Sequence, residues 1–402
     1  MRIAFLSSEF VRSGQPDGGL ANYLAKVCPL LREQGHDISV FVPGSGSGPV
    51  PRMPFELVEV PGFWAPTWMF RGFLYPYKEV CAQWVEARRL ATSLARAHTA
   101  KPYDIVQAAS WRAVGRAVVG KGIAPVVVRI SSWTPAYRAA HGRRTHLTDR
   151  ITDRFEQDQI RKADAVFAPS HLHADLVSSQ VRRHVGVIRT PFVIPDCSED
   201  EALYQAELRS RKYLLYFGKL NGVKGADVFA EALRQILPNR SDLHVAFLGD
   251  DGDRPDLPGT YGELVEAVCS AFRDRVHMLG CQPRETVLPV LRNAHLVVLP
   301  SRVDNYPNTC LEAQTLGKIV VGTRGTSLDE MICDGESGFL CQPASPDDLA
   351  NALQRALALS PHARSTMEAN VRGLARERDP QHDVDELIAL YQRTIAESPL
   401  TP

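Results

Sequence analysis

The sequence lacks the short patterns that identify several common classes of protein. None of its eight cysteines stands in a C-x-x-C pair, so nothing indicates a zinc site or a thioredoxin-like redox site. No G-x-G-x-x-G follows the first predicted strand, and no G-x-x-x-x-G-K-[ST] occurs anywhere. These two absences argue against a dinucleotide-binding dehydrogenase and against a P-loop enzyme.

The sequence also lacks an excess of charge and a long apolar run. It has 46 basic and 46 acidic residues, and this balance gives no reason to expect a nucleic-acid partner. No stretch is apolar enough for a transmembrane helix, and the apolar run within Met1–Phe10 is too short for a signal peptide. We therefore expect a cytoplasmic protein, for which any contact with the inner face of the membrane is peripheral.

Alternating strand and helix patterns fill the 402 residues. Short apolar runs such as Arg2–Leu6 and Leu243–Leu248 predict strands, and amphipathic stretches such as Gly18–Gln34 and Pro346–Leu357 predict helices. Because the alternation occupies both halves of the chain, we expect an α/β fold with two Rossmann-like parallel-sheet domains. We place an N-terminal domain at 1–195, a charged linker at 196–211, a second domain at 212–380, and at 381–402 a last helix that packs back across the seam.

The stretch Leu299–Ala313 is the most informative part of the sequence. A buried strand is predicted up to Pro300, a polar turn with Asp304 follows, and a predicted helix then carries Glu312. A strand that leads through a polar loop into a helix brings backbone N–H groups and a positive dipole end toward a ligand. Two carboxylates at that place suit a ligand rich in hydroxyl groups, and a nucleotide sugar has hydroxyls on its ribose and its sugar.

A second motif, Phe217–Gly225, places a glycine turn and two lysines between a predicted strand and a predicted helix. Lys219 and Lys224 can converge there on one anion such as a diphosphate, beside the start of the helix. The alternative is a solvated pair of lysines next to a turn. The glycines of a third motif, Gly18-Gly19, allow a ligand to approach the backbone closely, although an ordinary loop would also contain them.

In this order, the three motifs resemble the GT-B glycosyltransferases, specifically the retaining family 4 (glycosyl transferases group 1). The resemblance spans nearly the whole chain and includes Arg32–Val40, Ala163–Ser170, Val276–Gly280 and Gly335–Leu340. It implies two Rossmann-like domains facing a central cleft. It also implies transfer of a sugar from a UDP- or GDP-sugar to an acceptor hydroxyl, without a metal or a cofactor.

The resemblance assigns roles to individual residues. Lys219 and Lys224 match the basic pair that neutralises the diphosphate, and Glu312 matches the carboxylate that binds the ribose. Asp304 stands where relatives have a glutamate that reaches the transferred sugar, so Asp304 and the two lysines are the predicted catalytic residues. Loop residues complete the predicted donor site: Gly18, Gly19, Gly218, Gly280, Asn305, Tyr306, Pro307, Asn308 and Thr309.

The sequence departs from the family pattern in two respects. Asp304 is one methylene shorter than the usual glutamate, and Tyr306-Pro307 replaces Phe-Gly. This Asp-Asn-x-Pro-Asn-Thr variant resembles members that serve surface-polysaccharide pathways. Histidines that many relatives carry on the acceptor side are also missing, so no general base is identified; front-side displacement with the leaving phosphate as base would tolerate this loss. Polar residues in the corresponding loops are the acceptor candidates: Gln107, Ser110, Trp111, Arg129 and Ser131.

Two further segments allow more than one interpretation. Gly62–Lys78 contains seven aromatic residues, and forms either a loop that covers the core or a surface for sugar rings or a membrane interface. Tyr137–Arg154 is rich in arginine, which indicates either a solvated face or attraction to a phosphorylated acceptor or an anionic lipid.

The acceptor is accordingly a carbohydrate, a lipid-linked glycan or a natural product. Surface polysaccharide, glycolipid or glycosylated natural product biosynthesis would each use such a transferase. Two other hypotheses stay open: different nucleotide-sugar chemistry on the same fold, by an epimerase or a lyase, and a donor-binding scaffold without catalysis.

Overall fold

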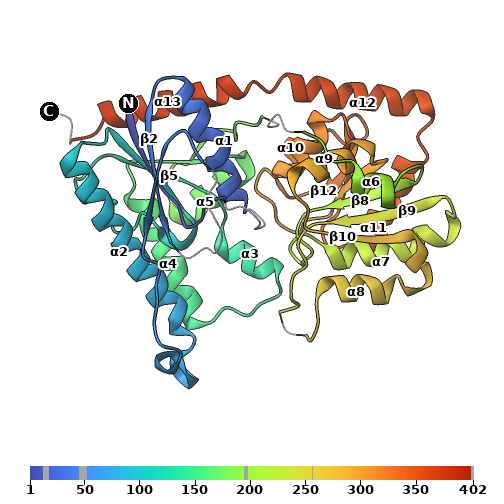
Figure 1. Cartoon of the computed structure of the whole chain (residues 1–402), viewed down its shortest axis with the longest axis horizontal. Helices are drawn as coiled ribbons and strands as arrows, with labels where there is room; N and C mark the ends of the chain where they lie inside the picture. Colours follow the sequence, from blue (N-terminus) through green and yellow to red (C-terminus); the bar gives the residue numbers. More distant parts are fainter. Residues whose placement is uncertain (12–17, 45–51, 194–197, 256, 400–402) are drawn as a thin grey trace. The chain divides into compact units, whose positions relative to one another are not determined.

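The structure is a computed structural model that describes residues 1–11, 18–44, 52–193, 198–255 and 257–399 (Figure 1). The described residues fall into two compact units. The first is drawn from Met1–Arg138, Arg144–Val193 and Asp379–Pro402, and the second from Ala139–Arg143 and Ile194–Arg378. Each unit has a parallel sheet with helices on both faces, so the predicted α/β fold with two Rossmann-like domains is confirmed.

The sheet of the first unit has seven parallel strands in the order β3-β2-β1-β4-β5-β6-β7. Strand β1 lies between β2 and β4, with Ile3 beside Ile38 on one side and Ile105 on the other. The strand order therefore reverses between β1 and β4. The loops that leave the carboxyl ends of these two strands diverge at this point. The strands are β1 (Arg2–Leu6), β2 (Asp37–Pro43), β3 (Glu56–Val60), β4 (Ile105–Ala109), β5 (Val126–Arg129), β6 (Ala165–Ala168) and β7 (Gly186–Val187).

The sheet of the second unit has six parallel strands in the order β10-β9-β8-β11-β12-β13. Strand β8 pairs with β9 on one side and with β11 on the other, with Leu214 beside Leu296. The reversal therefore falls between β8 and β11, the two strands that precede the predicted lysine and Asp304 motifs. The strands are β8 (Lys212–Phe217), β9 (Leu243–Leu248), β10 (Val276–Gly280), β11 (Leu296–Leu299), β12 (Val320–Thr323) and β13 (Gly338–Cys341).

Helices cover both faces of each sheet, which explains why strands such as β5 and β11 are buried along their whole length. In the second unit, α7 packs against α8 and α11, and α10 packs against α12 (Figure 1). No helix in the described part of the chain is long and apolar enough to cross a membrane. The helices are α1 (Gly19–Glu33), α2 (Tyr77–Ala100), α3 (Thr134–Ala140), α4 (Leu147–Lys162), α5 (His171–Val181), α6 (Ala202–Glu207), α7 (Ala226–Ile236), α8 (Tyr261–Val268), α9 (Arg284–Asn293), α10 (Asn308–Thr315), α11 (Pro346–Leu357), α12 (Pro361–Arg376) and α13 (Pro380–Ala396).

The last helix, α13, belongs to the first unit although it follows the second in sequence. It packs against α1, and Val384, Leu387 and Tyr391 are buried in the core of that unit. The Tyr391 hydroxyl donates a 2.5 Å hydrogen bond to Oε1 of Gln107 in β4. Of the predicted linker at 196–211, residues 196 and 197 lie outside the described residues. Its later part forms α6, which packs against α9 of the second unit.

Candidate functional site

The site in the second unit is built on the carboxyl ends of β8 and β11, where the strand order reverses. Lys219 lies two residues after the end of β8, and Asp304 lies five residues after the end of β11. In open parallel sheets, ligands bind at this position because two diverging loops leave room between them. The two motifs that the sequence singled out are thus neighbours in the fold.

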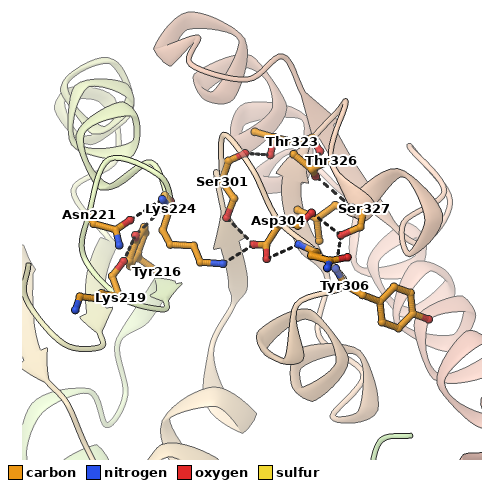
Figure 2. Close-up of polar contacts among 12 residues, drawn as sticks. Tyr216, Lys219, Asn221, Lys224, Ser301, Asp304, Tyr306, Thr323, Thr326 and Ser327 are labelled. Carbon is orange, nitrogen blue, oxygen red and sulfur yellow. Dashed lines mark hydrogen bonds and ion pairs between the residues drawn. The ribbon is translucent and has the colours of Figure 1, made fainter. Parts of the chain in front are cut away.

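Asp304 is the centre of a hydrogen-bonded cluster (Figure 2). Its carboxylate is only 8% exposed, and its Oδ2 lies 2.7 Å from the Nζ of Lys224. The same oxygen accepts a 2.9 Å bond from the Ser301 hydroxyl, and Oδ1 accepts the N–H of Asn305 at 3.1 Å. These contacts fix the orientation of the Asp304 carboxylate and of the Lys224 ammonium.

The loop that carries Lys224 is anchored to β8 through Tyr216. The hydroxyl of Tyr216 lies 2.9 Å from the Lys219 carbonyl and 3.2 Å from the Lys224 carbonyl. The amide of Lys224 donates to Oδ1 of Asn221 at 2.8 Å. Gly225 then takes a left-handed conformation, with φ at 71°, and a Cβ atom there would lie 2.0 Å from the carbonyl oxygen of Pro300. A glycine is therefore required where the two loops touch.

Arg302 joins the two loops from the side. Its guanidinium forms two bonds to the carboxylate of Asp227 in the first turn of α7, at 2.8 and 2.7 Å, and a further one to the Gly222 carbonyl. Its backbone N–H donates to the Val223 carbonyl at 2.7 Å. Sequence reasoning missed the roles of Arg302 and Asp227, because these two residues are 75 positions apart in the sequence and act through each other. It also missed Tyr216, whose hydroxyl bonds two backbone carbonyls of the loop that follows it.

Lys219 and Lys224 do not converge in this structure. The Nζ of Lys219 lies 3.1 Å from Oδ2 of Asp250, which follows β9, whereas Lys224 is paired with Asp304. In Figure 2 the two side chains point in different directions. Convergence on one anion would therefore require Lys219 to leave Asp250, and since its side chain is 54% exposed, such a movement meets little packing resistance.

The turn before α10 aims the start of this helix at the same loops. Tyr306 is buried with a positive φ of 57°, and its N–H donates to the Ser327 hydroxyl at 2.5 Å. The Ser327 hydroxyl in turn donates to the Asp304 carbonyl at 3.1 Å. Pro307 caps α10, and Asn308 and Thr309 of its first turn are partly exposed. The backbone amides of this turn carry the partial positive charge of a helix start.

Glu312, on the second turn of α10, is paired with the start of α9. Its Oε1 lies 3.0 Å from Nη1 of Arg284, and the carboxylate side chain is 9% exposed. Nε and Nη2 of Arg284 are buried and have no hydrogen-bond partner. Gly280, at the end of β10, has a positive φ of 67° and is exposed, four residues before Arg284. This side of the site thus contains guanidinium donors that are not yet used.

In the first unit, the predicted Gly18-Gly19 motif forms the start of α1. Oε1 of Glu9, from the loop after β1, accepts the N–H of Ala21 at 3.2 Å. A Cβ atom at Gly18 would lie 2.1 Å from the same oxygen, whereas one at Gly19 would meet nothing within 4 Å. Gly18 is thus needed to admit the Glu9 carboxylate, a contact that the sequence did not indicate.

Two of the predicted acceptor residues, Gln107 and Arg129, are buried in strands of the first unit, and a third, Ser110 on the loop after β4, is also buried, at 1% exposed. Gln107 is 3% exposed, and its amide bonds to the hydroxyls of Tyr23 and Tyr391 at 3.3 and 2.5 Å. Arg129 is 6% exposed and lies over the Tyr23 ring at 3.9 Å, with a 3.1 Å bond to Thr190. Burial lowers the pKa of Arg129. Direct contact with an acceptor would require these packed side chains to move.

The other three acceptor candidates lie on the loops after β4 and β5. Ser110 and Ser131 face each other at 3.3 Å between hydroxyls, and Ser131 accepts the N–H of Trp111 at 3.3 Å. Trp111 is 37% exposed. Glu156 of α4, which sequence reasoning missed, bridges both loops: Oε1 accepts the Arg112 N–H at 3.0 Å, and Oε2 accepts the Thr134 hydroxyl at 2.7 Å.

Within the described ranges, no group of three or more His, Cys, Asp or Glu side chains is placed to hold a metal ion. The residues of the site offer cations and helix-start amides around two buried carboxylates, Asp304 and Glu312, at the carboxyl ends of strands in the second sheet.

Two protein families match the chain. Residues 18–191 match the family described as glycosyl transferase 4-like domain, and residues 211–358 match the family described as glycosyl transferases group 1. The alpha-D-kanosaminyltransferase of Streptomyces kanamyceticus is 28% identical over 286 residues, which cover 67% of this chain and 70% of that protein. A D-inositol 3-phosphate glycosyltransferase of Mycolicibacterium vanbaalenii is 25% identical over 98% of this chain and 90% of its own length.

Solved structures share the fold over the full length. Sucrose-phosphate synthase from Thermosynechococcus elongatus has a TM-score of 0.79 and 18% identity, covering 99% of this chain and 100% of its own. HepE of Anabaena, solved in complex with UDP-glucose, has a TM-score of 0.72 and 20% identity, covering 98% and 100%. Both are GT-B neighbours of the two parallel-sheet units described above.

Proposed function

We propose that this chain, a glycosyltransferase of the GT-B fold, transfers a sugar from a nucleotide diphosphate sugar to an acceptor hydroxyl with retention of configuration. The observation that carries the proposal is the position of the Lys224 ammonium. It lies 2.7 Å from the buried Asp304 carboxylate, where the strand order of the second sheet reverses. A fixed cation at that place suits a ligand that carries phosphate.

The chemistry follows from where charge develops. When the bond between the anomeric carbon and the diphosphate oxygen breaks, negative charge grows on the leaving diphosphate. Lys224 and the amides at the start of α10 would stabilise that charge without a metal or a cofactor, because they are fixed before the reaction begins, and Lys219 would join them after leaving Asp250. The leaving phosphate would then accept the proton of the incoming hydroxyl on the same face, which gives retention.

The remaining donor contacts are assigned by their positions. Glu312 would accept the ribose hydroxyls through the oxygen that Arg284 leaves free, and Arg284 would retain donors for the nucleotide. Asp304 would orient Lys224 and reach the transferred sugar. Loop atoms would complete the site, and the residues proposed for it are Gly18, Gly19, Gly218, Gly280, Asn305, Tyr306, Pro307, Asn308 and Thr309.

Membership of the retaining family 4, with the Asp-Asn-x-Pro-Asn-Thr variant, is part of the proposal. The UDP-glucose complex of HepE supports a UDP-sugar as donor. The name of the D-inositol 3-phosphate glycosyltransferase supports a phosphorylated cyclitol as acceptor, and carbohydrate, lipid-linked and natural-product acceptors remain candidates. We propose a cytoplasmic location, with peripheral contact at the inner face of the membrane.

Isothermal titration calorimetry with a panel of UDP-, GDP- and ADP-sugars tests the proposal. We expect one nucleotide class to bind, and we expect Glu312→Gln to weaken that binding by about tenfold, as for loss of a charged hydrogen-bond acceptor. The control is Glu266→Gln, which changes an exposed carboxylate on α8. If no nucleotide sugar binds, or if Glu312→Gln binds as tightly as the control, the proposed donor site is wrong.

Product analysis separates transfer from the other hypotheses. Incubation with the donor alone should leave the sugar nucleotide unchanged apart from slow hydrolysis. Conversion of the donor into an isomer or an elimination product would identify an epimerase or a lyase. Binding without turnover across a broad acceptor screen would identify a scaffold.

A further inference from the structure

The segment between β3 and α2 presents large apolar side chains to solvent. We define the aromatic segment as residues 63–77. It contains six of the twelve exposed large hydrophobic side chains of the described chain, although single exposed apolar residues are ordinary on any protein. Trp64 is 79% exposed, Trp68 68% and Tyr75 67%. In Figure 1 the segment projects beyond the start of α2. Such a concentration marks an interaction surface.

An apolar hollow of about 420 Å³ lies under this segment. No charged side chain lines it. The lining comes from the aromatic segment, from the first half of α2 and from α4, and consists of Phe63, Met69, Phe70, Val80, Cys81, Trp84, Val85 and Phe155. A hollow without polar groups has no means to orient a sugar or a peptide, but it can accept a hydrocarbon chain.

The beginning of α4 lies at the same end of the first unit. Phe155 of α4 lines the hollow with residues 80–85 of α2, and farther along both helices Asp158 and Lys162 line the next hollow with Arg88 and Thr92. The two helices therefore run side by side in the same direction. The first turns of α4, which include the exposed Leu147, thus lie beside the aromatic segment.

The unpaired exposed charges around this end are of one sign. Arg71, Lys78, Arg150 and Arg154 are exposed, and within the described chain none of them forms an ion pair. The four neighbouring acids share two other arginines, so that together with the four cations above this end has six positive and four negative groups. Glu79 and Glu86 pair with Arg112 at 2.5 and 2.9 Å, and Asp149 and Asp153 pair with Arg138 at 3.5 and 2.7 Å.

We infer that this end of the first unit docks on an anionic lipid bilayer. Tryptophan and tyrosine side chains favour the boundary between head groups and hydrocarbon. Unpaired lysine and arginine side chains beside them are attracted to anionic head groups. The apolar hollow gives one lipid chain a place to enter. A second copy of the chain fits less well, because two surfaces of the same positive sign repel each other.

Docking would place the enzyme where a lipid-linked acceptor is found, and in this one respect the inference rests on the proposed function. The test does not depend on it, because vesicle binding is measured without donor or acceptor. Cosedimentation compares vesicles of phosphatidylcholine alone with vesicles that also contain phosphatidylglycerol. We expect binding to the anionic vesicles that weakens as salt is added.

Two pairs of substitutions identify the surface. Trp64→Ser with Trp68→Ser should lower the partition onto anionic vesicles by about tenfold or more, since both rings leave the interface. Arg150→Gln with Arg154→Gln should lower it several-fold and reduce its salt dependence. The matched controls change exposed residues of the second unit, Leu257→Ser and Arg273→Gln, and should bind like the unchanged protein.

Circular dichroism of each variant confirms that it is folded. The inference is overturned if the unchanged protein ignores anionic vesicles, or if folded tryptophan variants bind as well as the controls. It is also overturned if the tryptophan pair instead abolishes a concentration-dependent dimer seen by analytical ultracentrifugation. Vesicle binding by a protein that binds no nucleotide sugar would leave the inference standing and remove the proposed function.

Discussion

At the scale of single residues, the pair of Lys224 and Asp304 is the main determinant of the site. The carboxylate is buried and the ammonium is fixed 2.7 Å from it. Lys224→Met should lower kcat by about a hundredfold, the usual range for loss of one group that stabilises developing charge. Steady-state kinetics with the donor found by calorimetry measures this, with Lys121→Met, an exposed lysine of the first unit, as control.

The same substitution leaves Asp304 without its cation, so it should also lower stability, by about 1–3 kcal/mol. Adding Asp304→Asn removes the unpaired charge. The double variant should therefore recover much of the stability in urea unfolding and none of the turnover. Recovery of turnover would show that Lys224 acts only as a partner of Asp304 and that its assignment to the diphosphate is wrong.

Gly225 provides a second prediction at this scale. Because its φ is 71° and a Cβ atom would lie 2.0 Å from the Pro300 carbonyl, Gly225→Ala should destabilise the second unit by at least about 2 kcal/mol. Gly373 is the matched control. It lies inside α12 with nothing within 4 Å of its would-be Cβ, so Gly373→Ala should be neutral or stabilise by up to about 1 kcal/mol. Equal thermal unfolding of both variants would contradict this prediction.

At the scale of elements, Glu156 on α4 connects the loops after β4 and β5. These loops contain two consecutive residues with positive φ, Arg112 and Ala113. The pKa of Glu156 is raised from 4.5 to about 7, and burial is the largest cause. The charge of Asp153 also raises this pKa, whereas the bonds from Thr134 and Arg112 and the charge of Arg138 lower it. Glu156 therefore takes up a proton on folding at a pH between these two values.

The raised pKa of Glu156 makes the stability of the protein depend on pH. Because the folded state binds the proton more tightly, stability falls as pH rises from about 4.5 to about 7, and the loss is complete above the folded pKa. Glu156→Gln resembles the protonated carboxyl and should lack this loss. Its stability relative to the unchanged protein should rise across the window by up to about 3 kcal/mol. Urea unfolding at pH 5, 6, 7 and 8 measures this difference, and parallel curves would contradict it.

Elements with a strong apolar pattern were predictable from the sequence. Strands β1 and β9 have the predicted bounds, because helices on both faces of the sheets make most of their residues apolar. The edge strand β7 has two residues and no such pattern, and β3 has only one buried residue, Val60, so both were missed. Helix α12 was missed as well, because only Met367 and Val371 among its side chains are buried.

For the candidate site too, only part could be predicted from the sequence. The resemblance indicated Asp304, Lys224 and Glu312, and the fold places the first two in one cluster. The contacts of Arg302 with Asp227 and of Arg284 with Glu312 join segments that are far apart in the sequence, so they are known only once the fold is seen. The bonds of the Tyr216 hydroxyl are local, but a tyrosine in an apolar strand gives no sign of them. Buried candidates such as Gln107 were not recognisable as interior, because a polar residue at the end of a strand also suits a ligand site.

At the scale of the whole molecule, two parallel-sheet units of the GT-B type confirm the predicted fold class. Substitution of Tyr391 tests how far the stability of the first unit depends on α13. Its ring is fully buried in the first unit, so Tyr391→Ala should destabilise that unit by about 3–5 kcal/mol. Hydrogen exchange followed by mass spectrometry should show faster exchange in residues 1–193, and unchanged exchange in residues 212–378. Tyr391→Phe, which removes only the hydroxyl, serves as the milder control.

The position of α13 has a consequence for synthesis on the ribosome. The second unit is complete in sequence once residue 378 has been made, while the first still lacks the helix that covers part of its core. Val384, Leu387 and Tyr391 emerge after the whole second unit, so until then apolar surface of the first unit is uncovered. The half that is translated first would then be the half that matures last, and a nascent chain stalled before α13 should be a preferred client of chaperones that recognise exposed apolar surface.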